Sequence, residues 1–493
     1  MKLTKLLERI DYQVTQGTDQ VEITSLIYDS RKVEEGCVFV CIAGMVSDGH
    51  DFVIDVVDKG ANTLIVEKPV DVPEHVNVIL VGETRRALAY MSAAHFDYPG
   101  EKMKLIGITG TKGKTTTTYI TKSILEEVGY KVGLIGTIEA IIGEQHLPAL
   151  NTTPESYTIH EYLDQMVKAS CEIVVMEVSS QGLKLHRTAG IQFEIGIFTN
   201  LSHDHIGPGE HADFGEYRYC KSLLFRQCNL GIGNIDDENY DGIFEGSTCL
   251  KETYGFSEHA DLRASNVSLI KEPGHLGVAF DVTGLMNFHV EADIPGRFSV
   301  YNALTAIAVC NHFNAPKEAI LKALKVAKVK GRIEMIKVSD EFTLMIDYAH
   351  NAMSLESLLE TLRDYQPNRI VCLFGCGGNR SKDRRYEMGE ISGKLADLTV
   401  ITSDNPRHEE PQAIIDDIKV GIGRTNGEYV EIIDRREAIK YVIDHGQPGD
   451  IIVLAGKGHE DYQEIKGVKY PMDERVIIQE IMTAVYPKGE STR

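Results

Sequence analysis

Short apolar runs that alternate with helical stretches divide the sequence into three parts. The first part, residues 1–98, contains three strand-like runs separated by helical stretches, at 38–42, 63–66 and 76–81. The tripeptide Tyr98-Pro-Gly100 follows them, and Pro-Gly pairs are typical of a turn or a linker. This pattern predicts a first α/β domain that ends near residue 98.

Two further alternations follow this linker. The second part, residues 99–330, has continuous apolar runs at 105–108, 173–176 and 195–198. The third part, residues 331–493, has such runs at 342–346, 370–374, 398–401 and 451–454, with helices predicted near 353–364 and 411–420. Continuous apolar runs of this length are typical of parallel strands that are buried on both faces. We therefore predict an α/β fold of three domains, in which ligands bind beyond the carboxyl ends of the strands.

Composition narrows the classes of function. The 493 residues include 51 Lys and Arg against 73 Asp and Glu, so the formal net charge is −22. An acidic chain is a poor general nucleic-acid binder, because binding to a phosphate backbone needs clustered cations. No apolar stretch approaches the roughly 18 residues of a membrane helix, and no signal peptide precedes the first charged residues. Nine scattered cysteines fit reduced thiols. We expect a cytoplasmic protein that binds neither nucleic acid nor membranes.

A phosphate-binding loop is the strongest motif. The run at 105–108 leads into Thr109-Gly-Thr-Lys-Gly-Lys-Thr-Thr-Thr117, and a helical pattern then continues to Gly129. Backbone N–H groups and the helix N-terminus can hold phosphate, the Lys114 ammonium can reach the β- and γ-oxygens, and the Thr115 hydroxyl can bind Mg²⁺. Ile108 stands where the Walker pattern has glycine. The predicted ATP-binding loop consists of Gly110, Thr111, Lys112, Gly113, Lys114, Thr115 and Thr116.

Two strand-end segments supply candidate metal ligands. Glu177 ends the apolar run at 173–176, and His205 follows the run at 195–198 in Thr199-Asn-Leu-Ser-His-Asp-His205. A lone glutamate at this place is more often a solvated or capping residue, and a surface histidine is common in a chain with 17 histidines. Beside a phosphate loop, however, an oxygen ligand for Mg²⁺ becomes the better interpretation of Glu177.

The loop Thr-Gly-Thr-Lys-Gly-Lys-Thr-Thr resembles that of the Mur ligase and folylpolyglutamate synthetase superfamily. The resemblance implies three-domain enzymes that join amino acids by ATP-driven amide formation. It further implies a uridine-nucleotide-binding N-terminal domain, a P-loop-type central ATPase domain and a Rossmann-like C-terminal domain. Residues 28–36, Gly44 and 48–52 resemble the uridine-nucleotide domain, with Ser30 as a nucleotide contact. This match favours the muramoyl-peptide ligases, because folylpolyglutamate synthetases begin directly with the ATP domain.

The resemblance assigns a carbamylated lysine to the central domain. Lys221, in Arg218-Tyr-Cys-Lys-Ser-Leu-Leu-Phe225, matches the lysine that reacts with CO₂, and the carbamate would bind a second Mg²⁺. Without the resemblance, a single helical lysine would be interpreted as solvated. The segment 206–213 departs from the family pattern Leu-Asp-x-His-Gly. The implied catalytic residues are Lys114, Glu177, His205 and Lys221, and the implied metal ligands are Thr115, Glu177, His205 and carbamylated Lys221.

Other segments are similar to substrate-binding elements of the family. The UDP-muramoyl dipeptide would contact Asn151, Thr152, Thr153, Ser179 and Arg187, and ATP would also contact Asn302, Arg332, Asp347 and His350. Without the resemblance, residues 151–155 are interpreted as a helix N-terminus, with Thr152 or Thr153 as the cap and Pro154 in the first turn. Both interpretations of this segment can hold together.

Three strand-end turns of the third domain predict a pocket for the incoming amino acid. Its predicted residues are Arg385, Asp404, Asn405, Pro406, Arg407, Gly456 and Glu460. The string Asp-Asn-Pro-Arg resembles the signature of ligases that add meso-diaminopimelate, whose distal end carries both a carboxylate and an ammonium. The arginines can hold carboxylate, and Asp404 and Glu460 can hold ammonium. L-Lysine would leave the charge of Arg407 unpaired, which favours diaminopimelate.

The predicted activity is ATP- and Mg²⁺-dependent amide formation in peptidoglycan precursor synthesis. A carboxylate of the UDP-muramoyl dipeptide becomes an acyl phosphate, and the amine of meso-diaminopimelate captures it after closure of the third domain. No residue in the sequence stands out as the base for that amine. We expect a monomer. The alternatives are the same reaction with L-lysine or another amino acid, and a catalytically silent nucleotide-binding relative.

Overall fold

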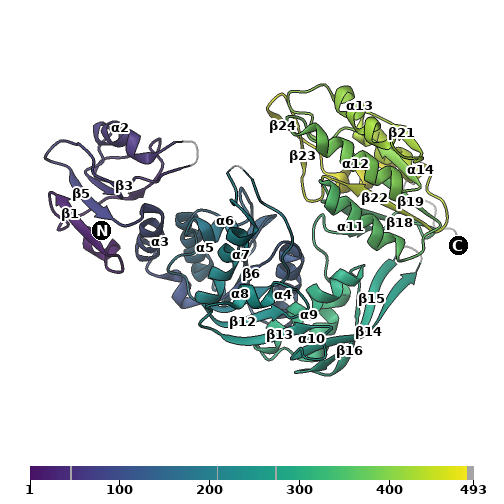
Figure 1. Ribbon diagram of the computed structural model, residues 1–493, viewed down its shortest axis with the longest axis horizontal. Helices are drawn as coiled ribbons and strands as arrows, with labels where there is room; N and C mark the ends of the chain where they lie inside the picture. Colours follow the sequence, from purple (N-terminus) through teal and green to yellow (C-terminus); the bar gives the residue numbers. More distant parts are fainter. Residues whose placement is uncertain (45–46, 208, 273–274, 486–493) are drawn as a thin grey trace. The chain divides into compact units, whose positions relative to one another are not determined.

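The structure is a computed structural model that describes residues 1–44, 47–207, 209–272 and 275–485. The chain divides into two compact units, and Figure 1 labels the helices and strands along the chain. The first unit comprises residues 1–263 and 304–319, and the second comprises residues 264–303 and 320–493. No helix in the described ranges is both long enough and apolar enough to cross a membrane. All nine cysteines are free thiols, in agreement with the sequence prediction.

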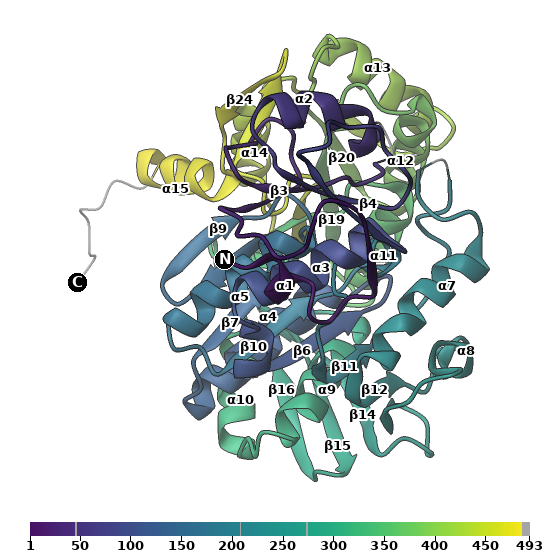
Figure 2. The same ribbon diagram turned by 90° about the vertical axis from the view of Figure 1, so that its left-hand side faces the viewer.

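The N-terminal part of the first unit is built on a five-stranded sheet. The strands are β1 (Tyr12–Gln16), β2 (Leu26–Ile27), β3 (Val38–Val40), β4 (Thr63–Val66) and β5 (Asn77–Val81), in the order β1-β5-β4-β3-β2. The helices are α1 (Leu3–Leu6), η1 (Gly49–Phe52), α2 (Val53–Asp58), α3 (Thr84–His95) and η2 (Pro99–Lys102). Apolar residues of α1 and α3 pack on one face of the sheet and those of α2 on the other. Figure 2 shows α2 on one side of β3 and β4, and α1 and α3 on the other.

The rest of the first unit is built on an eleven-stranded sheet that continues through β14 (Leu262–Glu272), β15 (His275–Gly284) and β16 (Phe288–Ala292). Its other strands are β6 (Lys104–Thr109), β7 (Val132–Ile135), β8 (Glu139–Ile142), β9 (Gln145–Pro148), β10 (Ile173–Glu177), β11 (Phe193–Phe198), β12 (Cys228–Asn234) and β13 (Leu250–Gly255). The order of these eight strands is β13-β12-β11-β6-β10-β7-β8-β9, and the β7–β8 and β8–β9 pairs are antiparallel. The helices are α4 (Lys114–Val128), α5 (Ser156–Lys168), α6 (Ser180–Lys184), α7 (Phe214–Ser222), η3 (Leu223–Arg226) and α8 (Tyr240–Phe244).

The register of this sheet brings the ends of three strands together. Glu177 of β10 pairs with Ile108 of β6, and Phe198 of β11 pairs with Thr109. Because the three strands are parallel, the loops that follow them leave the sheet at the same edge. All three runs were predicted as buried strands, and each is confirmed.

The second unit begins within β14 (Leu262–Glu272) and contains a second parallel sheet. Its further strands are β15 (His275–Gly284), β16 (Phe288–Ala292), β17 (Glu334–Ile336), β18 (Thr343–Asp347), β19 (Arg369–Phe374), β20 (Leu398–Ile401), β21 (Tyr429–Glu431), β22 (Asp450–Ala455), β23 (Tyr462–Ile465) and β24 (Val468–Pro471). The six-stranded sheet has the order β17-β18-β22-β19-β20-β21, in which only β17 pairs antiparallel.

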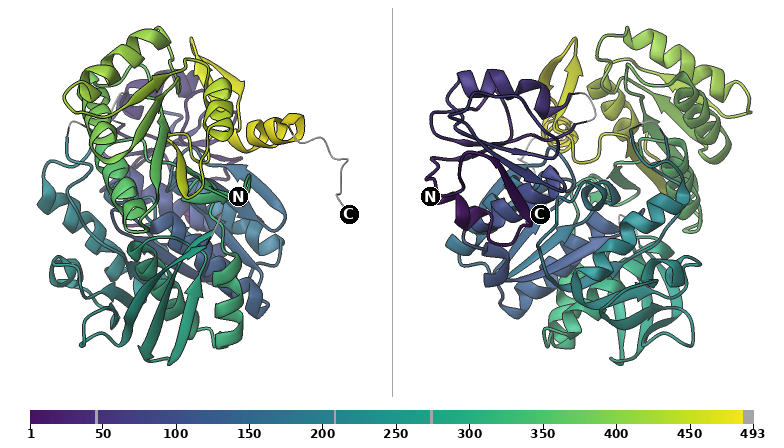
Figure 3. Two further views of the ribbon diagram at one scale, coloured as in Figure 1. Left: turned by 90° about the vertical axis from the view of Figure 1, so that its right-hand side faces the viewer. Right: turned by 60° about the vertical axis from the view of Figure 1, so that its left-hand side comes forward.

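Helices cover both faces of this six-stranded sheet. The helices of this part of the chain are α9 (Arg297–Asn311), α10 (Lys317–Val326), α11 (Ala352–Arg363), α12 (Lys382–Leu395), α13 (Pro411–Ile422), α14 (Arg435–Asp444) and α15 (Glu474–Val485). Apolar residues of α11, α12 and α13 pack on one face, and those of α14 and α15 pack on the other. The left panel of Figure 3 shows the green helices and the yellow helices on opposite sides of the strands. The strands and helices predicted for this part of the chain are therefore confirmed.

Candidate active site

The phosphate loop forms a tight turn between β6 and α4. Gly110 has φ +149° and Gly113 has φ +85°, so both adopt backbone conformations that favour glycine. A Cβ atom on Gly110 would lie 1.9 Å from Oγ1 of Thr199, so a side chain cannot be accommodated there. The Nζ atom of Lys114 donates to the carbonyl oxygens of Gly110 (2.8 Å) and Thr111 (3.1 Å). The lysine therefore caps the turn that a phosphate group would enter.

Thr199 and Asn200, which directly follow β11, form hydrogen bonds to the backbone of the phosphate loop. Asn200 accepts a hydrogen bond from the backbone N–H of Lys112 (2.9 Å) and donates one to its carbonyl (3.0 Å). Thr199 Oγ1 donates to the same carbonyl at 2.8 Å. The sequence analysis did not identify either residue as a support of the loop. The available signal was their position directly after a strand that neighbours β6.

Glu177 lies fully buried at the end of β10 and accepts three hydrogen bonds. Thr115 Oγ1 donates to its Oε2 at 3.0 Å. Thr137 donates to it twice, from the backbone N–H to Oε1 and from the hydroxyl to Oε2, both at 2.9 Å. The predicted proximity of Thr115 and Glu177 is therefore observed. Thr137, which follows β7, was missed because nothing near it in the sequence distinguishes it from other turn residues.

Lys221 is a buried lysine beside the phosphate loop. Its side chain is 1% exposed, and Nζ donates to the Gly110 carbonyl at 2.8 Å. Burial lowers the pKa of Lys221 well below its ordinary value, and the nearby charge of Lys114 lowers it further. The Tyr217 ring lies 4.6 Å from Nζ. The sequence alone would have made this lysine solvated, whereas the structure buries it beside the phosphate loop.

His205 does not join this cluster. Its side chain is half-exposed, its φ is +55°, and Nδ1 lies 3.1 Å from Oε1 of Glu210. Across the described ranges, no three His, Cys, Asp or Glu side chains lie together in an arrangement that could hold a metal ion. Of the four predicted metal ligands, Thr115, Glu177 and Lys221 therefore gather at the phosphate loop, whereas His205 pairs with its own loop.

The atypical segment 206–213, of which the structure describes all residues but 208, contains a buried histidine. The His211 side chain is almost fully buried, and Nε2 lies 2.9 Å from Oγ of Ser180 at the start of α6. Burial lowers the pKa of His211, so the neutral ring is favoured. At the other end of the segment, Asp213 caps α7 by accepting from the N–H of Glu216 (2.8 Å). Through His211 the segment that departs from the family pattern contacts α6, and through Asp213 it leads into α7, the helix that carries Lys221.

The predicted dipeptide-binding residues lie next to Glu177. Thr153 Oγ1 donates to the Glu177 carbonyl (3.0 Å) and accepts from the Ser179 N–H (2.9 Å). Arg187 donates to the Thr153 carbonyl at 2.9 Å and lies 3.5 Å from a carboxylate oxygen of Glu155. These contacts bring Thr153, Ser179 and Arg187 together.

The predicted helix cap in this segment is wrong. Glu155 is the N-cap of α5 and accepts from the Ser156 N–H, so neither Thr152 nor Thr153 is the cap. The Thr153 hydroxyl bonds to residues 177 and 179, and the Thr152 hydroxyl lies 3.0 Å from that of Thr137. Asn151 is exposed.

Ser30, the predicted uridine-nucleotide contact, lies in the turn after β2. Its side chain is half-buried, and its carbonyl accepts from Lys59 Nζ at 3.2 Å. The neighbouring Asp29 forms a bidentate pair with Arg31, which lowers the pKa of the Asp29 carboxyl to about 2. The turn therefore has an ordered polar surface.

Three of the predicted nucleotide contacts of the second unit lie in and around β18, and the fourth lies in α9. Asp347, at the end of this strand, accepts from the N–H groups of Ile333 and Ala349, both at 2.8 Å. Burial raises the pKa of Asp347, although the charge of Arg332 opposes this effect. The Arg332 guanidinium lies 4.8 Å from the centre of the Tyr348 ring, and His350 Nδ1 lies 2.9 Å from the Tyr348 carbonyl. Asn302 is buried in α9.

The turns after β20 and β22 place a connected set of polar residues at the carboxyl edge of the second sheet. Asn405 Nδ2 donates to Glu460 Oε2 at 2.9 Å, and its backbone N–H donates to Asp404 Oδ1 at 2.6 Å. Gly456 follows β22, and a Cβ atom there would lie 3.1 Å from Asp404 Oδ2. Pro406 separates this group from Arg407. A cavity of about 390 Å³ adjoins it, with Arg407, Gln463 and Arg435 in its wall.

Arg407 differs from the sequence-based expectation. It has φ +51°, its Nε lies 3.1 Å from Glu464 Oε2, and its Nη1 donates to the Gly378 carbonyl at 2.7 Å. The argument that a lysine-binding pocket would leave this charge unpaired is therefore wrong, because Glu464 already pairs it. Glu464 lies 57 residues further along the chain, and no local pattern connects the two.

Arg385 is buried and held by two carboxylates of the protein. Its guanidinium forms a bidentate pair with Glu409 (2.8 and 2.9 Å) and a further bond with Asp417 (2.9 Å). The pair lowers the pKa of Glu409 to about 2, chiefly through the hydrogen bonds from Arg385. Glu409 also accepts from the N–H of Asn379. Arg385 therefore braces the loop after β19.

Comparison with known proteins identifies relatives over the whole chain. Three family models match: the catalytic domain of the Mur ligase family at residues 22–96, the Mur ligase middle domain at 108–310, and the glutamate ligase domain of Mur ligases at 331–458. A protein of Clostridium acetobutylicum named UDP-N-acetylmuramoyl-L-alanyl-D-glutamate–2,6-diaminopimelate ligase 1 is 43% identical over 491 residues, covering 99% of this chain and all of the relative.

Two further matches agree. A Clostridium perfringens protein named UDP-N-acetylmuramoyl-L-alanyl-D-glutamate–2,6-diaminopimelate ligase is 41% identical over 489 residues, which covers 98% of this chain and 99% of the relative. A solved structure of a protein with the same ligase name aligns with a TM-score of 0.72 and 27% identity, and the alignment covers 99% of each chain. These matches extend across both structural units.

Proposed function

The chain belongs to the Mur ligase family, and from this premise we propose that it adds meso-diaminopimelate to UDP-N-acetylmuramoyl-L-alanyl-D-glutamate. The reaction joins an amine of the amino acid to the γ-carboxylate of the D-glutamate and converts ATP to ADP and phosphate. The contacts of Thr115, Glu177 and Lys221 around the phosphate loop are the observation that supports ATP-dependent activation of this carboxylate. The choice of amino acid rests on the names of the full-length relatives.

The chemistry follows from the weakness of a carboxylate as an electrophile. Transfer of the γ-phosphoryl group of ATP to the D-glutamate carboxylate forms an acyl phosphate with a good leaving group. The loop N–H groups and Lys114 would stabilise the negative charge that develops during this transfer. The neutral amine of meso-diaminopimelate then attacks the acyl carbon, and the tetrahedral intermediate expels phosphate to leave an amide.

Mur ligases use ATP and Mg²⁺, and the donor groups beside the loop fit that metal. The Thr115 hydroxyl and the Glu177 carboxylate are hard oxygen donors 3.0 Å apart. When bound, Mg²⁺ neutralises phosphate charge. Thr137 would keep the Glu177 carboxylate oriented, because it donates to both of its oxygens. We propose that Thr115 and Glu177 hold the metal and that His205 would join them only after its loop rearranges.

We also propose that Lys221 is carbamylated. CO₂ reacts with the neutral amine, and burial lowers the pKa of Lys221, which increases the fraction of that form. The resulting anionic oxygens would lie near the phosphate loop, because Nζ is 2.8 Å from the Gly110 carbonyl. A carbamate would therefore supply an additional, anionic metal ligand next to the loop.

The proposed division of labour follows three domains. Residues 1–98 would bind the uridine nucleotide, residues 99–330 would bind ATP and the dipeptide, and residues 331–493 would bind the amino acid. For the last pocket, the carboxylates of Asp404 and Glu460 would hold the distal ammonium, and Arg407 would hold the distal carboxylate. The nine free thiols support a reducing compartment, so we propose that the enzyme works in the cytoplasm.

A substrate panel tests the proposal. Purified protein is mixed with ATP, Mg²⁺ and the UDP-muramoyl dipeptide, and ADP formation is measured with meso-diaminopimelate, L-lysine or no amino acid. We expect ADP formation that requires the dipeptide and is fastest with meso-diaminopimelate. Preference for L-lysine would replace the substrate assignment, and the absence of turnover with every amino acid would instead support a catalytically silent relative.

A pair of variants tests the role of the loop. Lys114→Ala should abolish ADP formation, because the ammonium at the phosphate loop is lost. Lys104→Ala is the matched control, since this exposed lysine begins the strand that leads into the loop and pairs with Glu194 at the surface. Normal turnover by Lys114→Ala would contradict the proposed role of the loop.

A further inference from the structure

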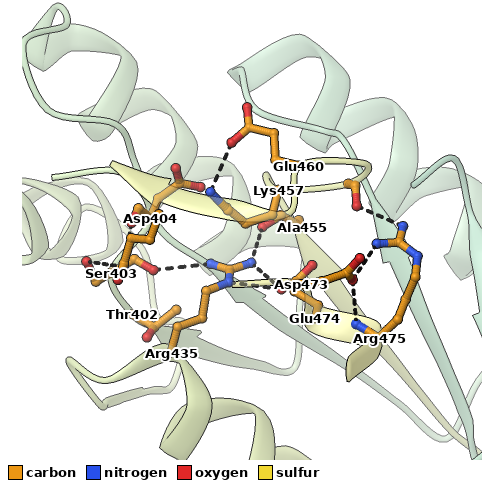
Figure 4. A network of polar contacts seen from close by, with 12 residues as sticks. Thr402, Ser403, Asp404, Arg435, Ala455, Lys457, Glu460, Asp473, Glu474 and Arg475 are labelled. Atoms are coloured by element: carbon orange, nitrogen blue, oxygen red, sulfur yellow. Dashed lines mark hydrogen bonds and ion pairs between the residues drawn. The ribbon is translucent and has the colours of Figure 1, made fainter. Parts of the chain in front are cut away.

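A fully buried lysine lies beneath the proposed amino-acid pocket. Lys457, in the turn after β22, has a relative exposure of 0%. Its Nζ donates to three acceptors, which are Asn405 Oδ1 (3.0 Å), Glu460 Oε2 (2.9 Å) and the Tyr462 carbonyl. A lysine ammonium has three N–H donors, so all of them are used. Figure 4 shows Lys457 pointing toward Glu460, with Asp404 beside it.

These hydrogen bonds determine how Asn405 is oriented. Its Oδ1 accepts from both Lys457 Nζ and the Glu464 N–H (2.8 Å), so its Nδ2 faces Glu460 Oε2 at 2.9 Å. The opposite orientation of the carboxamide would place its N–H₂ group against these two donors. Lys457 therefore selects one orientation of Asn405, and that orientation adds a second donor to the same oxygen of Glu460.

The same contacts leave one oxygen available on each of two carboxylates. Glu460 Oε2 is occupied by Lys457 and Asn405, whereas Oε1 receives no donor from the described residues. Asp404 Oδ1 accepts from the Asn405 N–H, and within the same described ranges Oδ2 receives none. The two carboxylates and the Lys457 ammonium sum to a net charge of −1. This charge matches a single substrate ammonium.

We infer that Lys457 is a positioning residue that orients Asn405 and Glu460 and thereby sets the affinity of the pocket for an amino acid with a distal ammonium. The inference rests on the proposed function and adds a residue that the pocket prediction did not include. Without the Lys457 ammonium, Glu460 Oε2 loses its charged donor and keeps only Asn405 Nδ2, and Asn405 Oδ1 keeps only the Glu464 N–H. Two neighbouring carboxylates would then repel each other, which favours protonation of one of them.

Steady-state kinetics of Lys457→Met test the inference. Methionine keeps an unbranched apolar stem in the buried space and removes only the ammonium. We expect the KM for meso-diaminopimelate to rise at least tenfold, with the KM for ATP unchanged. Lys394→Met is the matched control, because this exposed lysine of α12 pairs with Glu390 on its own helix, and it should leave both KM values unchanged. An equal rise in the KM for ATP would refute a specific role.

A double-mutant cycle shows whether Lys457 acts through Glu460. If it does, Lys457→Met should change the KM for meso-diaminopimelate much less in a Glu460→Gln background than in the wild type. Equal effects in the two backgrounds would overturn the inference. Failure of the proposed function is distinguishable, because the wild-type enzyme itself would then fail to use meso-diaminopimelate.

A second variant covers the case in which Lys457→Met does not fold. Lys457→Arg keeps the positive charge, but its planar guanidinium cannot present donors to the same three acceptors in the same directions. Its thermal transition should remain close to that of the wild type, while the KM for meso-diaminopimelate rises at least tenfold. A folded Lys457→Arg enzyme with a wild-type KM would refute the need for an exact donor geometry and thus the inference.

Discussion

The helices α14 and α15 are joined by two ion pairs that differ mainly in burial. Arg435 begins α14 and pairs with Glu474 at the start of α15 (2.8 Å), and both side chains are at most 1% exposed. The next residue, Arg436, pairs with Glu480 at 2.5 Å, and both of these side chains are half-exposed. We predict that Arg435→Met destabilises the C-terminal part of the chain far more than Arg436→Met does.

The expected magnitude follows from what each arginine contacts. Besides Glu474, Arg435 donates to the carbonyl of Ala455 (3.0 Å) and, at 3.4 Å, to that of Ser403. Its removal leaves a buried carboxylate without a countercharge, which costs about 3–5 kcal/mol. For a domain of roughly 150–250 residues, about 2–4 °C per kcal/mol gives a fall in Tm of about 6–20 °C. The exposed pair contributes about 0–1 kcal/mol, so Arg436→Met should lower Tm by at most about 4 °C.

Differential scanning calorimetry measures both shifts, and hydrogen exchange of the α14 amides assigns the transition. Replacing both partners, in Arg435→Met/Glu474→Met, should restore much of the lost stability, because no buried charge then remains unpaired. Burial raises the pKa of Glu474, so in Arg435→Met this acid should take up a proton more readily. The destabilisation should then be smaller at acidic pH. Equal shifts for Arg435→Met and Arg436→Met would refute the reasoning.

Three further predictions concern the active site. Turnover should fall in CO₂-free buffer, and added bicarbonate should restore it. The fall should be larger at lower pH, because the neutral amine of Lys221 becomes scarcer. The Lys221→Met variant should not respond to bicarbonate. Glu177→Gln should raise the Mg²⁺ concentration for half-maximal ADP formation by about 10–100-fold, whereas Glu172→Gln, just before β10, should not. Arg407→Ala should weaken the preference for meso-diaminopimelate over L-lysine by about 10–100-fold, as expected for one or two charge-assisted hydrogen bonds. Unchanged discrimination in a competition assay would show that the distal carboxylate binds elsewhere.

The strands and the phosphate loop could be predicted because their signals are local. Apolar runs such as 105–108 and 173–176 identify strands without knowledge of their partners. The glycines at 110 and 113 and the following Lys-Thr identify a phosphate loop over a few adjacent residues. Glu177 could be proposed as a metal ligand because strand ends of a parallel sheet meet at one edge, which is a general property of the fold.

The groups that orient these side chains could not be predicted in the same way. Thr137 lies 40 residues from Glu177, and Asn200 lies 88 residues from Lys112, yet each forms two short hydrogen bonds to its distant partner. Lys457 binds Asn405 from 52 residues away. Their residue types are common in turns, so a pattern along the chain does not distinguish them from residues without such a role.

Burial and pairing reversed two sequence-based interpretations. The helical pattern around Lys221 would make it a solvated cation, whereas the fold buries it against the Gly110 carbonyl. The sequence favoured an Arg407 whose charge stays unpaired until a ligand binds, whereas Glu464 already forms an ion pair with it. In both cases the sign and size of the electrostatic effect depend on the dielectric surroundings and on the nearest opposite charge.

The linear order of residues by itself determined the α/β class, the phosphate loop and the chemical types of the candidate ligands, because these depend on periodicity and on neighbours within a few residues. Only the tertiary structure decided which of those groups are dehydrated, which are already paired and which distant donors hold them in place. The physical reason is that desolvation and hydrogen bonding act through space over a few ångströms, whereas the residues that meet there are separated by tens of positions along the chain.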